Sequence, residues 1–323
     1  MSVKRIDYID IAKAIGILIV LWSHTGAEVG MMTYLGGMMI PVFFIVSGFT
    51  YKGTNNMFQS LGKKLKRLII PHFIFSLLLL LFFRAFHLID LIGIFYSRYS
   101  LYPLDNSENL YFFSSGNPPI WFLTAMFTAY VIFEIYCKTN IKPLYVYATG
   151  IISCFFLDRI PILLPWSIDS CFLFSLFIYT GYKFNYHIQE TTGKKIILMT
   201  CIYVLTCYIN GYCNLSVREY GHSFLFVIIS GVTGTMIVVY FSKILAKSKL
   251  KTIFTCIGKH SLVIFCTQSI AIRLCNKLMF ESSLLPYTHA SVICVAFIKV
   301  FAACILGITI SLFMKKYLPF IKI

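Results

Sequence analysis

Ten apolar stretches, each close to the length of one membrane crossing, constrain this chain more than any other feature of its sequence. An α-helix needs about 20 mostly apolar residues to cross roughly 30 Å of hydrocarbon. We therefore predict an all-α, polytopic membrane bundle of about ten transmembrane helices, with residues 1–323 forming a single membrane domain. The stretches cover 8–27, 35–51, 68–87, 119–137, 142–158, 166–184, 195–210, 221–242, 259–279 and 289–314, and 88–100 is apolar enough for a re-entrant or interfacial piece.

The composition excludes an ordinary soluble enzyme, because 59% of the residues are hydrophobic and only 12% are charged. The net charge of +16 would suggest nucleic acid in a soluble protein. Here the cations alternate instead: the N-terminus and the even-numbered loops hold twenty Lys and Arg, and the odd-numbered loops hold four. This asymmetry predicts that both termini are cytoplasmic, so the charge reflects membrane topology and we expect no nucleic-acid partner.

The first apolar stretch resembles a signal peptide in length only. It has no small-x-small cleavage site and contains Asp10 and Lys13, so we expect it to be retained. The eleven cysteines include no C-x-x-C pair, and most lie within apolar stretches. We interpret them as small buried hydrophobic residues and predict neither a metal site nor a disulfide framework.

A polar stripe runs along the first predicted span. At 100° per residue, Asp10, Lys13, His24 and Glu28 lie within an arc of about 60°, on a helix that is otherwise almost entirely apolar. Polar side chains inside a membrane mark a bundle interior or a water-filled cavity. The stripe is therefore predicted to face such a cavity.

His24 is the candidate general base, because an imidazole can exchange a proton near neutral pH. Glu28, one helical turn later, is placed to orient the ring. The alternative is a buried histidine that hydrogen-bonds a neighbouring helix, with Glu28 in an outer loop. Asp10 and Lys13 form either a structural ion pair or part of the chemistry. Lys299 lies near mid-membrane and needs a partner that the sequence does not identify.

These residues resemble the opening of the acyltransferase family 3 proteins, in particular the segment RIDYIDIAKAIGILIVLWSHTG from Arg5 to Gly26. Further matches follow in order: PVFFIVSGF at 41–49, KKLKRLIIP at 63–71, PPIWFL at 118–123, PWSIDSCFLFSLFIYTGYKF at 165–184 and IGKHSLVIFCTQ at 257–268. The later segments are most similar to the fucose 4-O-acetylase-like branch. Family members often carry His where this chain has Gln268, so we place catalysis on His24 alone.

The resemblance implies a ten-helix membrane enzyme that transfers an acetyl group from cytoplasmic acetyl-CoA to a hydroxyl of a cell-surface or lipid-linked glycan. It also implies a multi-pass protein of the bacterial inner (plasma) membrane, with acetyl-CoA as co-substrate and no permanently bound cofactor. Arg67, Lys64 and Lys63 are the expected acyl-CoA-binding residues, since a guanidinium can bind phosphate in a bidentate manner. The same basic run could serve topology alone.

The remaining candidates are assigned by position. Ser47, beside Gly48, is expected chiefly to let helices approach closely, although an acetyl-enzyme on Ser47 or His24 stays an alternative to direct transfer. Trp121 is either a surface for sugar stacking or an interfacial anchor. Gln268 and Arg273 are further acceptor-side candidates. A glycan or small-molecule transporter or flippase is the alternative function, although the chain has no matching halves. The oligomeric state is not predicted.

Overall fold

The computed structural model describes residues 6–26, 29–53, 56–83, 88–97, 120–160, 162–282, 284–285 and 288–318. Regular structure in these ranges is helical, with one isolated antiparallel bridge between Asn214 and Glu219. All eleven cysteines are unpaired; seven are buried, and Cys201 and Cys294 are exposed.

The helices succeed one another along the described residues. Their bounds are α1 Asp7–Ser23, α2 Val29–Met39, α3 Pro41–Phe49, α4 Met57–Lys64, the π-helix η1 Leu65–Ile69, α5 Ile70–Phe83, α6 Leu88–Tyr96, α7 Trp121–Thr139, α8 Pro143–Leu157, the 3-10 helix η3 Pro165–Ser167, α9 Cys171–Lys183, α10 Asn185–Gln189, α11 Gly193–Asn210, α12 Phe224–Leu245, α13 Lys251–Asn276, the π-helix η4 Lys277–Glu281 and α14 His289–Tyr317.

Each of the ten apolar stretches contains helix, and α6 occupies most of the stretch 88–100. The stretch 35–51 is not continuous: it divides between α2 and α3 at Pro41, which has no backbone N–H for an intrahelical hydrogen bond. Five described segments are long and apolar enough to cross a membrane, namely Gly30–Phe49, Met57–Phe83, Phe224–Leu245, Lys251–Glu281 and Ala290–Tyr317. The total of ten spans and the cytoplasmic termini stay predictions.

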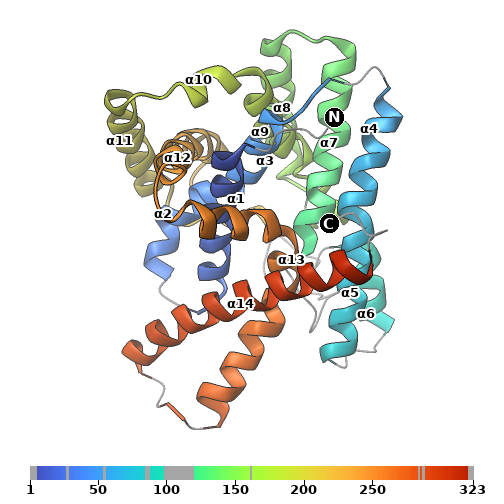
Figure 1. The fold of residues 1–323 in the computed structure, drawn as a ribbon. Coiled ribbons are helices and arrows are strands. Elements are labelled where there is room, and N and C mark those ends of the chain that lie inside the picture. The colour runs from blue at the N-terminus through green and yellow to red at the C-terminus, as the bar shows by residue number, and fades with distance from the viewer. Residues whose placement is uncertain are drawn as a thin grey trace.

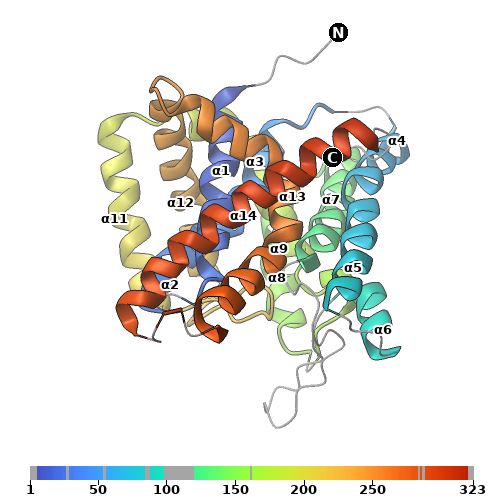
Figure 2. The ribbon, with the colours of Figure 1, turned by 60° about the horizontal axis from the view of Figure 1, so that its bottom comes forward.

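Helix α1 lies at the centre of the bundle. It contacts α2, α3, α12, α13 and α14 (Figure 1), and α13 in turn packs along α14. Its start lies toward the same end of the molecule as α4 (Figure 2), so residues early in α1 are near the basic run that follows α4. A helix surrounded in this way presents its polar stripe to other helices rather than to lipid.

Glycines at helix crossings bring backbones together. A Cβ on Gly48 of α3 would collide with the Ile178 carbonyl oxygen of α9, and a Cβ on Gly181 of α9 would collide with the Ile45 carbonyl oxygen of α3. The expectation that Ser47-Gly48 permits close helix approach is therefore confirmed. The two glycines fix α3 against α9 at a distance that no larger residue allows.

A similar crossing joins α13 to α1 and gives a testable prediction. A Cβ on Gly258 would lie 2.5 Å from the carbonyl carbon of Asp10 and closer still to its oxygen. We expect Gly258→Ala to lower the free energy of unfolding by about 1–3 kcal/mol, because overpacking forces backbones apart. The matched control is Gly62→Ala in α4, where a Cβ meets no atom within 4 Å. The measurement is thermal unfolding in detergent. If the unfolding temperature of Gly258→Ala is not below that of Gly62→Ala, the crossing is not tight.

Candidate active site

Residues of the polar stripe of α1 line two cavities, one after the other along the helix. Asp10 is buried, Lys13 is half-buried, and the Lys13 Nζ lies 3.5 Å from the Asp10 Oδ1, so the structural pair expected from the sequence is present. His24 caps the C-terminal end of α1, and its exposed side chain lines the second cavity. Asp10 and Lys13 thus line one cavity and His24 lines another. Glu28 lies outside the described residues.

The first cavity, called here the basic cavity, has a volume of about 170 Å³ between α1, α3, η1, α7 and α13. It is rich in cations that come from three separate segments of the chain, namely α1, the junction of α4 with η1, and α13. Its charged, histidine and hydroxyl-bearing lining residues are Asp10, Lys13, Ser47, Thr50, Lys64, Arg67, Tyr130, Lys259, His260 and Ser261. A concave site with several fixed cations is suited to a polyanionic ligand.

Arg67 reaches the basic cavity from the π-helix η1. Pro71, four residues later, has no N–H to donate to the Arg67 carbonyl oxygen, and its ring would crowd that carbonyl in a regular α-helix. The helix widens instead, and the Ile70 N–H donates to the Leu65 carbonyl oxygen five residues back. Single π-turns of this kind are frequent at functional sites. The KKLKRLIIP segment thus encodes both the cation and the local distortion that places it.

The other candidates, Lys64, Lys63 and Ser47, differ in whether they line the basic cavity. The Lys64 Nζ lies 3.6 Å from the centre of the Tyr130 ring, and both residues line the basic cavity. Lys63 is exposed and is not among the lining residues. Ser47 lines the cavity and its hydroxyl donates to the Phe44 carbonyl oxygen at 2.6 Å.

The second cavity, called here the His24 cavity, has a volume of about 230 Å³. It brings together two candidates from the sequence, His24 and Trp121, with the loop after α11. Its lining residues are Val20, Ser23, His24, Met32, Met39, Ile40, Trp121, Phe122, Tyr212, Cys213, Asn214, Leu215, Ser216 and Phe265.

Two aromatic side chains line both cavities. Phe122 of α7 and Phe265 of α13 have ring centres 5.4 Å apart with a tilt of 58° between the planes. Phe122 also packs edge-on against Phe43 and Phe44 of α3. The pair therefore forms the shared wall between the basic cavity and the His24 cavity, and Trp121 precedes it in the PPIWFL segment.

Lys299 has the partner that the sequence did not identify. It is 4% exposed on α14, and its Nζ donates to the Thr25 carbonyl oxygen at 2.6 Å. Thr25 directly follows His24, at the end of α1 where backbone carbonyls lack intrahelical partners and a cation is favoured. Lys299 thus fixes the chain at the residue next to the candidate base.

For the acyl transfer that the family resemblance implies, we expect Lys299→Met to lower turnover by about tenfold, with the KM of the acyl donor unchanged. Methionine preserves the volume but leaves the Thr25 carbonyl without its charged donor, which is worth about 1.5–3 kcal/mol. Lys299→Arg, which keeps a charged donor, should recover part of the activity. Steady-state kinetics at saturating donor measure this effect, and a donor KM that rises in place of the fall in turnover would contradict it.

The other acceptor-side candidates lie apart from both cavities. Gln268 is fully buried, its side-chain nitrogen donates to the Phe265 carbonyl oxygen at 3.1 Å, and its Oε1 has no hydrogen-bond partner. Arg273 is exposed and lies 3.7 Å from Glu281. Neither residue is among those lining the basic or the His24 cavity. Gln268 therefore contacts the shared wall indirectly, through the backbone of Phe265.

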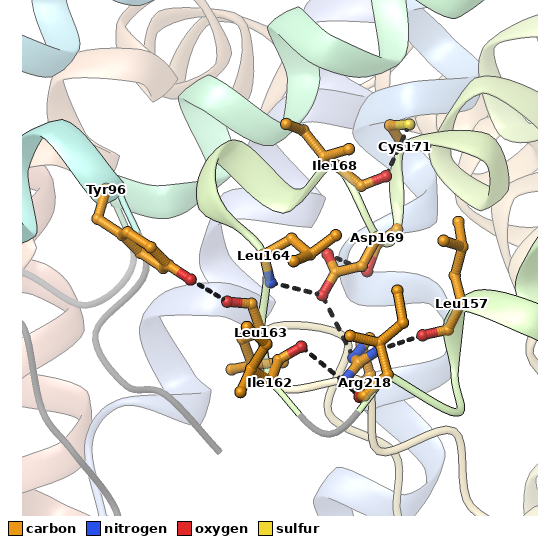
Figure 3. A network of polar contacts seen from close by, with 11 residues as sticks. Tyr96, Leu157, Ile162, Leu163, Leu164, Ile168, Asp169, Cys171 and Arg218 are labelled. Carbon is orange, nitrogen blue, oxygen red and sulfur yellow. Dashed lines mark hydrogen bonds and ion pairs between the residues drawn. The ribbon is translucent and has the colours of Figure 1, made fainter. Parts of the chain in front are cut away.

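A buried ion pair organises the end of the bundle that holds the His24 cavity (Figure 3). The Arg218 Nε lies 3.3 Å from the Asp169 Oδ2, and both side chains are buried. The guanidinium also donates to the carbonyl oxygens of Leu157, Ile160 and Ile162, and Asp169 accepts from the Leu164 N–H at 3.1 Å. One arginine thereby ties the loop after α11 to the connection between α8 and α9.

Sequence reasoning missed several of these residues. Lys259 and His260 belong to the IGKHS segment that was noted for its resemblance alone, and the His260 Nδ1 lies 2.7 Å from the Ser311 Oγ of α14. Arg218 was counted only as a loop charge. No sequence signal distinguishes it from an exposed arginine, because its partners are backbone carbonyls from a distant segment.

Comparison with known proteins agrees with this arrangement. A family model for the acyltransferase domain of acyltransferase family 3 matches residues 6–314, which include both cavities and every described residue of the stripe. The fucose 4-O-acetylase-like branch is not distinguished by this match. Searches of curated proteins and of solved structures gave no match. The chain is therefore a member of the acyltransferase 3 family, a multi-pass helical membrane acyltransferase.

Proposed function

We propose that this protein is an O-acetyltransferase that moves an acetyl group from cytoplasmic acetyl-CoA to a hydroxyl of a cell-surface or lipid-linked glycan. The observation that carries the proposal is the pair of cavities along α1, one lined with cations and one with His24, which share the wall formed by Phe122 and Phe265. The donor can thus approach the shared wall from the basic cavity, and the acceptor can approach it from the His24 cavity.

The basic cavity suits the donor. The phosphates of acetyl-CoA are polyanionic, and Arg67, Lys64 and Lys259 offer charge-assisted donors around its mouth. The cytoplasmic location of this mouth follows from the positive charge of the adjacent loop. In this arrangement the pantetheine arm extends past Ser47 toward the aromatic wall, and the acetyl thioester reaches the His24 side. No permanently bound cofactor takes part.

His24 supplies the proton transfer. Its imidazole accepts the proton of the acceptor hydroxyl while the hydroxyl oxygen attacks the thioester carbonyl carbon. The new C–O bond forms, the C–S bond breaks, and the leaving thiolate takes that proton from the His24 imidazolium to give free CoA and the neutral imidazole. Ser47 lines the basic cavity and His24 the other one, which favours direct transfer over an acetyl-enzyme on Ser47.

The His24 cavity suits the acceptor. Trp121 offers an apolar ring beside His24, and Asn214 and Ser216 add polar groups from the loop after α11. A few convergent polar groups on an apolar wall are typical of sites that orient a small ligand. A glycan presented from outside the bacterial inner membrane would enter here, opposite to the donor.

The decisive experiment follows both substrates with the purified protein in detergent or nanodiscs. We expect free thiol to appear only when acetyl-CoA and the host's de-O-acetylated surface polysaccharide are both present, and the polysaccharide to gain acetyl groups by mass spectrometry. A transporter or flippase would instead move glycan across a vesicle membrane without releasing thiol. That result would overturn the proposal.

We expect Arg67→Ala to raise the KM for acetyl-CoA by at least about tenfold with a smaller change in turnover, because a charge-assisted phosphate contact contributes about 1.5–3 kcal/mol. The matched control is Lys66→Ala, an exposed cation on the same π-helix that does not line the basic cavity. Equal donor KM values for the two variants would show that Arg67 does not contribute to donor binding.

A further inference from the structure

A third and larger pocket adjoins the His24 cavity. It has a volume of about 590 Å³ and is called here the Glu219 pocket; its lining residues are Asp158, Tyr212, Arg218, Glu219, Tyr220, Gly221, His222, Ser223 and Phe224. Tyr212 lines this pocket and the His24 cavity alike. The side chain of Tyr212 is 45% exposed, so a ligand can contact it while reaching both spaces.

The walls of the Glu219 pocket are held in place by Asn210 at the end of α11. Its side chain donates to the Tyr220 carbonyl oxygen at 2.8 Å and accepts from the Ser223 N–H at 2.9 Å. Gly221 has a φ of +70° and packs so closely on Asn210 that a Cβ would collide with it. The loop is therefore a fixed frame before any ligand arrives, which reduces the entropy cost of binding.

The charge of the pocket is negative or neutral rather than basic. Arg218 is buried, and its guanidinium is occupied by Asp169 and by backbone carbonyls (Figure 3). The exposed carboxylates of Asp158 and Glu219 remain, beside the exposed imidazole of His222. Burial raises the pKa of Tyr212 and the Glu219 carboxylate raises it further, so the phenol stays a neutral hydrogen-bond donor.

We propose that the Glu219 pocket is a subsite for the acceptor glycan, which binds the sugars that follow the acetylated one and accepts neutral or amine-bearing sugars rather than anionic ones. Carboxylates accept hydrogen bonds from sugar hydroxyls, and tyrosine rings supply apolar faces. A volume of about 590 Å³ is within the range of about 300–1,000 Å³ of small-ligand sites. The inference rests on the proposed function, because it extends the acceptor away from His24.

The test uses graded fragments of the natural acceptor. Surface polysaccharide from host cells that lack this protein is de-O-acetylated with mild alkali, cut by partial acid hydrolysis and separated by length. Acetyl transfer to each fraction is measured by thiol release for the wild type and for Tyr212→Ala and Glu219→Gln. The controls are Tyr208→Ala and Glu190→Gln, which alter exposed residues outside all three cavities.

For the wild type we expect the acceptor KM to fall as the fragments lengthen. Tyr212→Ala and Glu219→Gln should raise the KM of long fragments about tenfold, which corresponds to about 1.4 kcal/mol. Glu219→Gln should leave the KM of the shortest acceptor and of acetyl-CoA unchanged, because Glu219 lines neither the His24 cavity nor the basic cavity. Pocket variants that behave like the controls, or preferred fragments that are anionic, would overturn the subsite. A wild type that transfers to no fraction would instead overturn the proposed function, and the subsite with it.

Discussion

Replacing His24 by alanine will lower acetyl transfer by about 10²–10⁴-fold, the usual contribution of a positioned general base. His24 caps α1 through its backbone, since its N–H donates to the Leu21 carbonyl oxygen at 3.1 Å, and its side chain projects into the His24 cavity. Alanine therefore removes the base while leaving the helix end intact. We expect the KM for acetyl-CoA to stay within about twofold, because the basic cavity is separate.

The measurement is acceptor-dependent thiol release at saturating acetyl-CoA. His187→Ala is the matched control, since His187 is an exposed histidine on α10 and lines none of the three cavities. Unfolding temperatures of both variants should equal that of the wild type, which separates loss of chemistry from loss of fold. Undiminished transfer by His24→Ala would exclude His24 as the base even though the family assignment stands.

The second large effect concerns stability. Arg218→Met is expected to lower the free energy of unfolding by about 3–5 kcal/mol, because removing one partner of a buried ion pair leaves the other charge uncompensated. Asp169 would lose its cation, and the carbonyls of Leu157, Ile160 and Ile162 would lose their donors. The connection between α8 and α9 would then no longer be tied to the loop after α11.

Thermal unfolding in detergent checks this effect. The matched control is Arg159→Met, because Arg159 is an exposed arginine on the same connection, and its guanidinium carbon lies 4.3 Å from the centre of the Phe155 ring. We expect its unfolding temperature to be close to that of the wild type, since interactions of exposed cations contribute little. Equal unfolding temperatures for Arg218→Met and Arg159→Met would mean that the buried pair does not hold this end of the bundle.

The proposed reaction connects these effects to function. Arg218 lines neither the basic cavity nor the His24 cavity, but the loop it anchors carries Tyr212 and Asn214 into the His24 cavity. Arg218→Met should therefore also weaken acceptor binding at temperatures below its unfolding transition. His24→Ala should leave acceptor binding unaffected, so the two variants separate positioning of the acceptor from proton transfer.

Much of the helical framework could be predicted from local sequence. Apolar stretches of sufficient length predict helices wherever backbone groups must be satisfied without water, and each of the ten contains helix. A missing proline N–H accounts for both the break at Pro41 and the π-helix before Pro71. The apolar pattern alone predicted neither. The predicted boundaries of the helices were therefore less accurate than their predicted positions in the chain.

The candidate site was predictable only along a single helix. Helical periodicity places Asp10, Lys13 and His24 on one face, and in the structure these three residues line cavities. The wall of Phe122 and Phe265 was not predictable, because two phenylalanines 143 positions apart carry no local signal of contact. The partner of Lys299 was not predictable either. Its charge indicated that a partner is needed, but that partner is a backbone carbonyl, which has no sequence signature.

The sequence by itself determined that the chain forms apolar helices, that a polar stripe runs along the first of them, and that the chain resembles the acyltransferase 3 family. These properties follow from length, periodicity and side-chain chemistry within short windows. Only the tertiary structure decided which residues surround His24 and Arg67, and where Lys299 and Arg218 find their partners. Such contacts join residues far apart in the chain, and packing between helix surfaces selects them.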